Sequence, residues 1–378
     1  MTITQRKVTQ HTIIVDVNGD DTDSDIKQLI ADSNYGTAVE LKLIIKQYGY
    51  SLFFAKNYKD KTLPLLPSWN NRDKQDVIYQ KIIRLCQKAQ VIFAREDRVL
   101  SIKSPTIVFG DIHGNLRDLL NYEKVFWLNK IMESDNENVL FLGDYVDRGY
   151  FGIEVIIYMF ALKILAPKKF YFIRGNHELR INTCVPGAHS FQKECTDKFG
   201  TKNGQSLHET INKVFDCLPF CAVIDGTIFC AHGGIPATIM DIKNLMSIPC
   251  PLPDPEKQCI AVWEILWNDP ISTPEFGVQS EMIREISGPI AFTNLQGFFP
   301  NFKRGTGYVF NEEALNKFFQ MNGLNQVIRA HETCQNGYRI DMKEKVITLF
   351  STSQYCGGTN KGGCAYVTQD QIKLIKFN

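Results

Sequence analysis

The sequence predicts an α/β fold whose functional groups gather at the ends of its strands. From about residue 100 onward, short β-rich runs alternate with helical segments, a pattern that indicates an α/β core. Five of these runs lead directly into an acid, an amide or an imidazole, and α/β sheets build their sites at the carboxyl ends of strands. The chain has 378 residues, 44% of them hydrophobic and 22% charged. This length and composition suit one large or two ordinary globular domains and exclude wholesale disorder.

The N-terminal region has a different pattern. A strand-like run at residues 12–17 is followed by helical stretches at 24–31 and 38–48. A turn-rich break follows at residues 64–69. We therefore divide the chain into an N-terminal extension of unknown role, residues 1–72, and a main domain, residues 73–378. The extension is expected to pack on the main domain, and an independent regulatory module is the alternative. The apolar spacing of residues 76–93 predicts a packed helix at the start of the main domain.

Charge, hydropathy and cysteine content exclude several classes of protein. Lys and Arg total 42 against 41 Asp and Glu, so the chain offers no overall basic footprint for nucleic acid or an anionic membrane surface. No apolar run approaches the roughly 18 residues of a membrane span, and the first residues contain no hydrophobic signal segment. The eleven cysteines are odd in number and include no Cys-x-x-Cys. We expect reduced thiols in a cytoplasmic and/or nuclear protein.

The polar groups at the strand ends are predicted to form one site. The runs 106–109, 139–142, 170–173, 227–231 and 327–330 lead into Asp111 and His113, Asp144, Asn176 and His177, His232, and His331, in that order. Each residue alone would usually be a turn or hydrogen-bonding residue. Four of the seven histidines of the chain lie at these ends, however, and separate structural roles do not explain that distribution.

This set of donors predicts a site for two metal ions. Imidazoles mixed with oxygen ligands suit Mn, Fe or Zn rather than Ca or a thiolate zinc site. Asp111 and His113 are one residue apart, so on an extended segment both side chains can face one metal. Asp144 has two carboxylate oxygens and can bridge two ions. The ligands that would complete the second ion are Asn176, His232 and His331.

Two neighbouring metal ions favour hydrolysis of a phosphate ester. Such a pair holds a phosphate and activates water for in-line displacement at phosphorus. The reaction also needs cations on the equatorial oxygens and an acid for the leaving group. Arg148 follows Asp144 by four residues and His177 directly follows Asn176, so both kinds of group lie near the predicted ligands. On an extended segment adjacent side chains point in opposite directions, so Asn176 and His177 are not expected to bind the same ion.

Eight strings carry a family resemblance that runs from about residue 75 to the C-terminus. They are Gly110-Asp-Ile-His-Gly114, Gly143-Asp-Tyr-Val-Asp-Arg-Gly149, Arg174-Gly-Asn-His-Glu178, His232-Gly-Gly234, Arg329-Ala-His331, Leu266-Trp-Asn-Asp-Pro270, Lys303-Arg-Gly305 and Gln354-Tyr-Cys-Gly357. In combination they resemble the PPP family of metal-dependent serine/threonine protein phosphatases, with the look of type 1 and type 2A catalytic subunits. The resemblance implies a central β-sandwich of mixed sheets flanked by helices, the metallo-dependent phosphatase fold.

The resemblance also implies a reaction and a role for each site residue. The reaction is hydrolysis of phosphoserine and phosphothreonine in proteins, by a water that two metal ions activate for in-line attack on phosphorus. One ion would take Asp111, His113 and the bridging Asp144, and the other would take Asp144, Asn176, His232 and His331. Phosphate would bind Arg148, Arg304 and Asn176, His177 oriented by Asp147 would be the general acid, and Tyr355 would line the site. The implied partners are phosphoprotein substrates and regulatory subunits. No binding to nucleic acid or to a membrane is expected.

Some segments depart from the family pattern. The stretch after Glu178, up to His189, lacks the Tyr-Gly-Phe sequence that the family usually has there. The loop at residues 122–138 is longer than is usual in the family. Gln354 stands at a position where the family usually has Asn, and Asn115 stands where the family often has Gln. The inhibitor and docking preferences of the family are therefore not carried over to this chain.

Two other functions stay open. A metallophosphoesterase acting on nucleotides would share the site, although that group tends to contain Gly-His-x-His where this chain has Arg329-Ala-His-Glu332. A non-catalytic scaffold with the same fold would usually have lost a ligand, and here every ligand is present. A cysteine-dependent phosphatase needs Arg at the sixth position after its Cys, which Cys334 and Arg339 miss by one residue.

Overall fold

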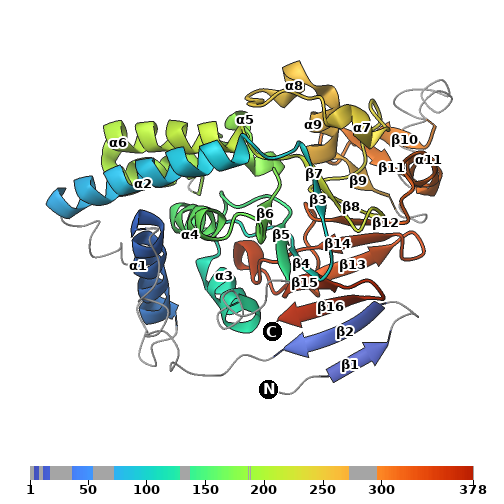
Figure 1. The fold of residues 1–378 in the computed structure, drawn as a ribbon, viewed down its shortest axis with the longest axis horizontal. Coiled ribbons are helices and arrows are strands. Elements are labelled where there is room, and N and C mark those ends of the chain that lie inside the picture. Colours follow the sequence, from blue (N-terminus) through green and yellow to red (C-terminus); the bar gives the residue numbers. More distant parts are fainter. Residues whose placement is uncertain are drawn as a thin grey trace.

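Two facing β-sheets form the centre of the molecule, and helices cover their outer faces (Figure 1). The computed structural model describes residues 4–7, 12–17, 36–53, 72–127, 137–271 apart from 186 and 188, and 296–377. The predicted α/β fold, a central sandwich of mixed sheets flanked by helices, is confirmed.

The first sheet has seven strands in the order β1-β2-β16-β15-β4-β5-β6. In that order they are β1 (Thr4–Lys7), β2 (Thr12–Val17), β16 (Ile372–Phe377), β15 (Gly362–Val367), β4 (Thr106–Phe109), β5 (Asn138–Phe141) and β6 (Phe170–Phe172). β4, β5 and β6 are mutually parallel, whereas β15 is antiparallel to β4. β2 pairs in parallel with β16, so the N-terminal extension adds two strands to one edge of this sheet.

The second sheet has six strands in the order β13-β14-β12-β8-β7-β3. They are β13 (Tyr338–Asp341), β14 (Val346–Leu349), β12 (Gln326–Arg329), β8 (Ile228–Ala231), β7 (Cys221–Ile224) and β3 (Val99–Ile102). β12 runs parallel to both β8 and β14. A small three-stranded sheet contains β10 (Phe298–Pro300), β11 (Tyr308–Phe310) and β9 (Asp269–Pro270).

Alternation along the strands explains why the sheets are covered on both faces. In β4, Ile107 and Phe109 pack against the helices, whereas Val108 packs between the two sheets. In β8, Phe229 faces the outer layer and Cys230 faces the space between the sheets. Successive side chains of a strand point to opposite faces. Because both faces of these strands are buried, their residues are apolar except for Thr106 of β4.

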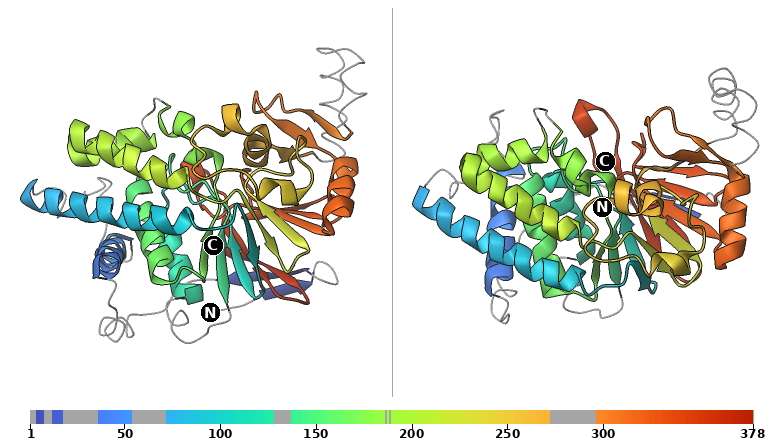
Figure 2. Two further views of the ribbon diagram at one scale, coloured as in Figure 1. Left: turned by 45° about the horizontal axis from the view of Figure 1, so that its top comes forward. Right: turned by 90° about the horizontal axis from the view of Figure 1, so that it is seen from above.

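Helices on the outer face of the seven-stranded sheet form one layer. They are α1 (Gly36–Phe53), α2 (Arg72–Phe93), α3 (Leu116–Tyr122) with a π-helical continuation (Glu123–Trp127), α4 (Gly152–Leu165) and α6 (Phe191–Phe215). α4 is apolar nearly all round because it is enclosed by the sheet and by α1, α2 and α6. α2 and α6 lie side by side, as Figure 2 shows from above.

The remaining helices are short or cover the other sheet. They are α5 (Arg180–Thr183), α7 (Ile242–Leu245), α8 (Pro255–Gln258), α9 (Ile260–Trp267) and α11 (Glu312–Asn322), with 3₁₀ turns at Asn176–Glu178 and Tyr355–Gly357. α9 and α11 pack with β8 and β12 in the core outside the six-stranded sheet. No helix among the described residues combines the length and apolarity that a membrane crossing requires.

The N-terminal extension contributes α1, β1 and β2 to these layers. The strand predicted at 12–17 is β2, and the helical stretch at 38–48 is part of the longer α1. α1 packs against α3 and α4 (Figure 1). The stretches at 24–31 and 64–69 lie outside the described residues. The helix predicted at 76–93 is α2, which begins four residues earlier.

Candidate active site

The predicted metal ligands meet at one end of the sandwich, where strands of both sheets end. Asp111 and His113 follow β4, Asp144 follows β5, Asn176 follows β6, His232 follows β8 and His331 follows β12. All six side chains are buried. The first three of these strands belong to one sheet and the last two to the other. The face-to-face packing of the two sheets therefore brings the six residues together.

Left-handed backbone conformations orient several of these residues. The φ angles of His113, Asp144, Asp147, Arg148 and His331 lie between 44° and 69°, a region that residues other than glycine seldom adopt. Strained conformations of this kind persist only where the surrounding structure fixes them, and they cluster at functional sites.

Two expectations about local backbone were wrong. The segment from Asp111 to His113 is not simply extended, because His113 is left-handed; this turn nevertheless brings His113 Nε2 to 3.6 Å from Asp111 Oδ2. Asn176 and His177 lie in a 3₁₀ turn rather than on an extended segment. Their side chains therefore do not diverge by strand alternation, and the separate environment of His177 comes from its tertiary contacts.

Glu178 fastens the loops that carry the ligands, a role that sequence reasoning missed. Its carboxylate accepts the backbone hydrogens of Asp144, Tyr145 and Gly175 at 2.8–2.9 Å. The loops approach so closely that a Cβ at Gly175 would lie 2.3 Å from Asp144 N. Glycine is required there because no side chain fits. The string Arg174–Glu178 signalled this residue, but its acceptor role depends on the second loop.

Backbone carbonyls determine which imidazole nitrogens face the centre of the site. His113 Nδ1 lies 2.9 Å from Val146 O, and His232 Nδ1 lies 2.9 Å from Leu142 O. A carbonyl oxygen only accepts, so each Nδ1 carries a hydrogen and each Nε2 is the nitrogen available to a ligand. A metal-binding histidine usually donates its other ring hydrogen in this way.

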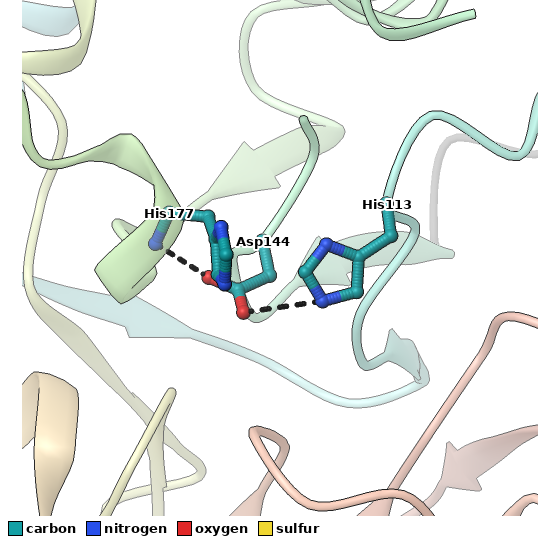
Figure 3. A group of neighbouring side chains, drawn as sticks. All are labelled: His113, Asp144 and His177. Carbon is teal, nitrogen blue, oxygen red and sulfur yellow. Dashed lines mark hydrogen bonds and ion pairs between the residues drawn. The ribbon is translucent and has the colours of Figure 1, made fainter. Parts of the chain in front are cut away.

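Asp144 offers one oxygen to each side of the site. Its Oδ2 lies 3.5 Å from His113 Nε2, and its Oδ1 lies 3.3 Å from His232 Nε2. Figure 3 shows one carboxylate oxygen facing the ring of His113 and the other facing the backbone nitrogen of His177. The potential ligand atoms form two groups that share Asp144, namely His113, Asp144 and His177, and Asp144, His232 and His331. This division is the geometry that a bridging carboxylate requires.

Atoms that can accept a hydrogen bond or bind a cation lie close together around His232. His232 Nε2 lies 2.8 Å from Asn176 Oδ1 and 3.0 Å from His331 Nδ1. Burial lowers the pKa of His331 well below its usual value, with the charge of Arg304 adding to the effect. Burial opposes the charge of His232, but the carboxylate of Asp144, together with those of Asp111 and Glu178, raises the pKa of His232. A cation between these donors would replace the proton, so the residues fit a metal ion.

Asp111 and Asp144 are buried carboxylates close enough to affect each other. Asp111 Oδ1 accepts the backbone hydrogen of His331 at 2.9 Å, while its Oδ2 faces His113. Burial and then the charge of Asp144 raise the pKa of Asp111 to about 6. Burial, followed by the charge of His177, lowers the pKa of His113 to about 4, and neutral imidazole is the form that binds metals. Two carboxylates and a neutral imidazole make a site that favours a divalent cation.

His177 is held by Asp147, at the edge of the cluster. His177 Nδ1 lies 2.7 Å from Asp147 Oδ2, and the backbone N–H of His177 donates to Asp144 Oδ1 at 2.9 Å (Figure 3). Burial disfavours the imidazolium, but the charge of Asp144 and the hydrogen bond to Asp147 raise its pKa to about 9. A cation bound to Asp144 would cancel the effect of the Asp144 charge on the pKa of His177. The Asp147 hydrogen bond is the contribution that persists.

The two predicted phosphate-binding arginines have different surroundings. Arg148 directly follows Asp147 and is exposed. Arg304 donates from Nε to Asp269 Oδ2 at 2.8 Å and from Nη2 to His331 O at 2.9 Å, which places it beside the ligand cluster. Asp269 also accepts from Arg329 at 2.7 Å. Sequence reasoning assigned no role to Asp269, although it lies in the Leu266–Pro270 string.

Tyr355 lies over the ring of His113. The two rings are stacked with centroids 5.1 Å apart and planes inclined by 29°. Tyr355 is half-buried, and its backbone N–H donates to Asn360 Oδ1 at 2.9 Å. The predicted site-lining tyrosine is therefore in contact with a predicted metal ligand.

Comparison with known proteins places the chain in a family. The chain is similar to a protein serine/threonine phosphatase from Saccharomyces cerevisiae that resembles human phosphatase PP5, with a TM-score of 0.67 and 24% identity over 89% of this chain and 96% of the other. A cold-active protein-tyrosine phosphatase of a psychrophilic Shewanella species has a TM-score of 0.44 and 18% identity, over 73% and 80% of the two chains. The family model of the calcineurin-like phosphoesterases matches residues 104–335, which is more than half of the chain. The chain thus belongs to the calcineurin-like phosphoesterase family.

Proposed function

We propose that this protein is a metal-dependent phosphatase that hydrolyses phosphoserine and phosphothreonine in proteins. The observation that carries the proposal is the carboxylate of Asp144, which offers Oδ2 to His113 and Oδ1 to His232 within a buried cluster of lone pairs. A buried cluster of acceptors needs cations to compensate it. Its place at the strand ends of a phosphoesterase domain supports chemistry at phosphorus.

The residues fit two ions of Mn, Fe or Zn. The first would be held by Asp111, His113 and Asp144, and the second by Asp144, Asn176, His232 and His331. When bound, such ions supply positive charge beside the phosphate and lower the pKa of the attacking water. Imidazole nitrogens combined with carboxylate and amide oxygens favour these metals over Ca.

The chain's own side chains have the remaining tasks. Arg148 and Arg304 bind the phosphate oxygens, because a planar guanidinium matches two oxygens at once. His177 donates a proton to the departing serine or threonine oxygen, and Asp147 keeps its ring in position. Tyr355 covers His113 and lines the same site.

Protein substrates are favoured over nucleotides by two observations. The yeast relative that shares this fold is a protein serine/threonine phosphatase. In addition, the residue after His331 is Glu332, whose carboxylate accepts from Arg329 at 2.9 Å and from Arg339 at 2.8 Å. Glu332 belongs to an ion-pair network, and the position two residues after His331, where a Gly-His-x-His motif has its second histidine, is Thr333. Regulatory subunits and a cytoplasmic or nuclear location remain part of the proposal.

The proposal is tested by comparing substrates with the manganese-loaded protein. We expect kcat/KM for phosphoserine and phosphothreonine peptides to exceed that for cyclic nucleotides and dinucleoside polyphosphates, with p-nitrophenyl phosphate as the generic control. A preference for the nucleotides would assign the chain to the alternative phosphoesterase class. Failure to hydrolyse any of these substrates, with two metals measured per chain, would indicate a non-catalytic scaffold.

A further inference from the structure

The segment that carries Arg148 is held at its start by the N-terminus of α6. We call residues 147–153 the Arg148 loop. Asp147 Oδ1 accepts the backbone hydrogen of Phe191 at 2.6 Å, and Arg148 N donates to His189 O at 3.0 Å. Asp147 and Arg148 have φ angles of 64° and 69°. Since this left-handed conformation is unfavourable in itself, outside contacts must maintain it.

The end of the Arg148 loop is held by Glu194, one turn further along α6. Glu194 Oε2 accepts from Gly152 N at 3.0 Å, and Oε1 accepts from Ile153 N at 2.9 Å. These are the first amides of α4, which have no acceptor within the helix. Phe151, the residue before α4, makes no side-chain hydrogen bond to them. Glu194 therefore caps α4 from another helix, and its negative charge suits that helix end.

Lys198 holds the middle of the Arg148 loop and fixes Glu194. Its Nζ donates to Tyr150 O at 2.9 Å, to Glu194 Oε1 at 2.6 Å and to Glu154 Oε2 at 2.7 Å. All three charged side chains are at most 10% exposed. Buried charge-assisted bonds of this kind are stronger than neutral ones. The first two turns of α6 thus hold the loop at its start, its middle and its end.

We propose that Glu194 is a positioning residue for Arg148. Only the residues between Asp147 and Gly152 separate the two tethered ends of the loop, so release of one end lets Arg148 leave its left-handed conformation. The inference rests on the proposed function, in which Arg148 binds phosphate. Glu194 contacts Gly152, Ile153 and Lys198, and acts on the phosphate through the loop.

The test measures binding of inorganic phosphate to the manganese-loaded protein by calorimetry. Glu194→Gln replaces one acceptor with a donor that faces a backbone N–H. We expect it to weaken phosphate binding on the order of tenfold, the value of one charge-assisted hydrogen bond. In an Arg148→Ala background the same change should weaken binding less than twofold, because the residue that Glu194 positions is gone.

Matched variants and a second readout separate positioning from general stability. Lys193→Ala removes an exposed pair with Asp197 on the same helix and should leave phosphate binding unchanged. Hydrogen exchange at residues 147–153 should be faster in Glu194→Gln, while metal content stays the same. If that variant does not fold, Glu194→Asp keeps the charge beside Lys198 but is one methylene short of the α4 amides, and should show the same pattern.

Two results would overturn the inference. The first is an equal loss of phosphate affinity in the presence and absence of Arg148, and the second is unchanged exchange in the Arg148 loop. Neither readout depends on turnover. A wild-type protein that hydrolyses no phosphoester would therefore refute the proposed function, while the exchange comparison would still decide whether Glu194 holds the loop.

Discussion

His177 Nδ1 lies 2.7 Å from Asp147 Oδ2, and the other oxygen of Asp147 accepts the backbone hydrogen of Phe191 at 2.6 Å. The ring of His177 is thus oriented by a carboxylate that is itself fixed by a helix N-terminus. Its second ring nitrogen remains available to a substrate or to a metal. The first group of potential ligand atoms includes His177, so both roles need to be distinguished by experiment.

We predict that His177 is the acid that protonates the leaving group. His177→Asn should keep both metals and lose roughly 10²–10⁴ in kcat/KM on a phosphoserine peptide. The loss should be clearly smaller on p-nitrophenyl phosphate, because nitrophenolate leaves without a proton. The measurement is kcat/KM on both substrates with metal content determined in parallel. Equal losses on the two substrates, or a missing metal ion, would instead identify His177 as a ligand or an electrostatic group.

We predict that two metal ions bind and that Asp144 serves both. Asp144→Asn should reduce binding of both ions, because Oδ1 and Oδ2 face different histidines. Asp111→Asn is the control, since Asp111 faces His113 and should affect one ion. Metal content by mass spectrometry and activity after manganese addition measure the difference. Chelators should abolish activity, and full turnover in a demetallated sample would contradict the prediction.

We predict that Arg304 acts on the phosphate and has little effect on the fold. Arg304→Ala should raise KM, lower kcat and leave metal content unchanged, with kcat/KM lower by roughly 10–100-fold. The melting temperature should change little because Asp269 keeps its pair with Arg329. Arg304→Lys should recover little, since an ammonium cannot reproduce the guanidinium fork. Unchanged kinetics would exclude Arg304 from phosphate binding.

The corresponding change at Arg148 should have similar kinetic effects. Arg148 is exposed, so Arg148→Ala should leave the melting temperature nearly unchanged. The comparison of KM and kcat for the two variants shows whether both arginines bind the phosphate in the ground state. A large loss of stability in Arg148→Ala would point to a structural role.

Asp118 gives a pH-dependent prediction away from the metal ligands. Its Oδ2 accepts from Ser353 N at 2.6 Å and from Asn115 Nδ2 at 2.7 Å. Burial nevertheless raises its pKa to about 6, with the Ser353 hydrogen bond opposing the shift. The folded state therefore holds a proton that the unfolded state releases at a lower pH. Stability from this group is complete at acidic pH and is lost as pH rises from about 4 to about 6.

Asp118→Asn should remove this pH dependence. The amide oxygen still accepts the two N–H groups and carries no charge. Above pH 6 the free energy of unfolding of the variant should exceed that of the wild type by up to about 3 kcal/mol. Below about pH 4 the two should converge. Melting temperatures of the metal-free proteins at several pH values measure this, and parallel curves would contradict it.

The contact between α1 and the main domain can be tested at Glu123. This carboxylate lies 3.4 Å from Lys46 Nζ and 3.5 Å from Lys42 Nζ, and its side chain is 1% exposed. Burial lowers the pKa of Lys46, and the charge of Glu123 opposes that shift. Glu123→Ala should therefore destabilise the protein by about 3 kcal/mol.

Two companion variants complete this test. Lys81→Ala, which removes an exposed pair with Glu40, should change stability by less than about 1 kcal/mol. Lys46→Met combined with Glu123→Gln should recover part of the loss, because the buried charges are removed together. Chemical denaturation measures all three. No effect of Glu123→Ala would mean that this ion pair does not hold α1 on the main domain.

Local patterns of apolar and polar residues in the sequence were enough to predict the fold class. The mainly apolar runs that form β4, β8 and β12 are visible without any structure, because most positions of a strand buried on both faces are apolar. The donors that follow them, such as Asp144 and His232, were identified because their types suit metals and their positions suit strand ends. Element boundaries shifted by a few residues, as in α2, since helix ends depend on capping and packing.

Contacts between distant segments decided the rest. The sequence by itself determined an α/β chain with a set of metal-binding donors at its strand ends. The tertiary structure decided that Asp144 divides its oxygens between His113 and His232, and that Leu142 O sets the tautomer of His232. It also decided that Glu194 holds the Arg148 loop. Each of these joins residues more than thirty positions apart or depends on a left-handed turn. Local propensity does not encode such contacts, because the packing of the whole chain stabilises them.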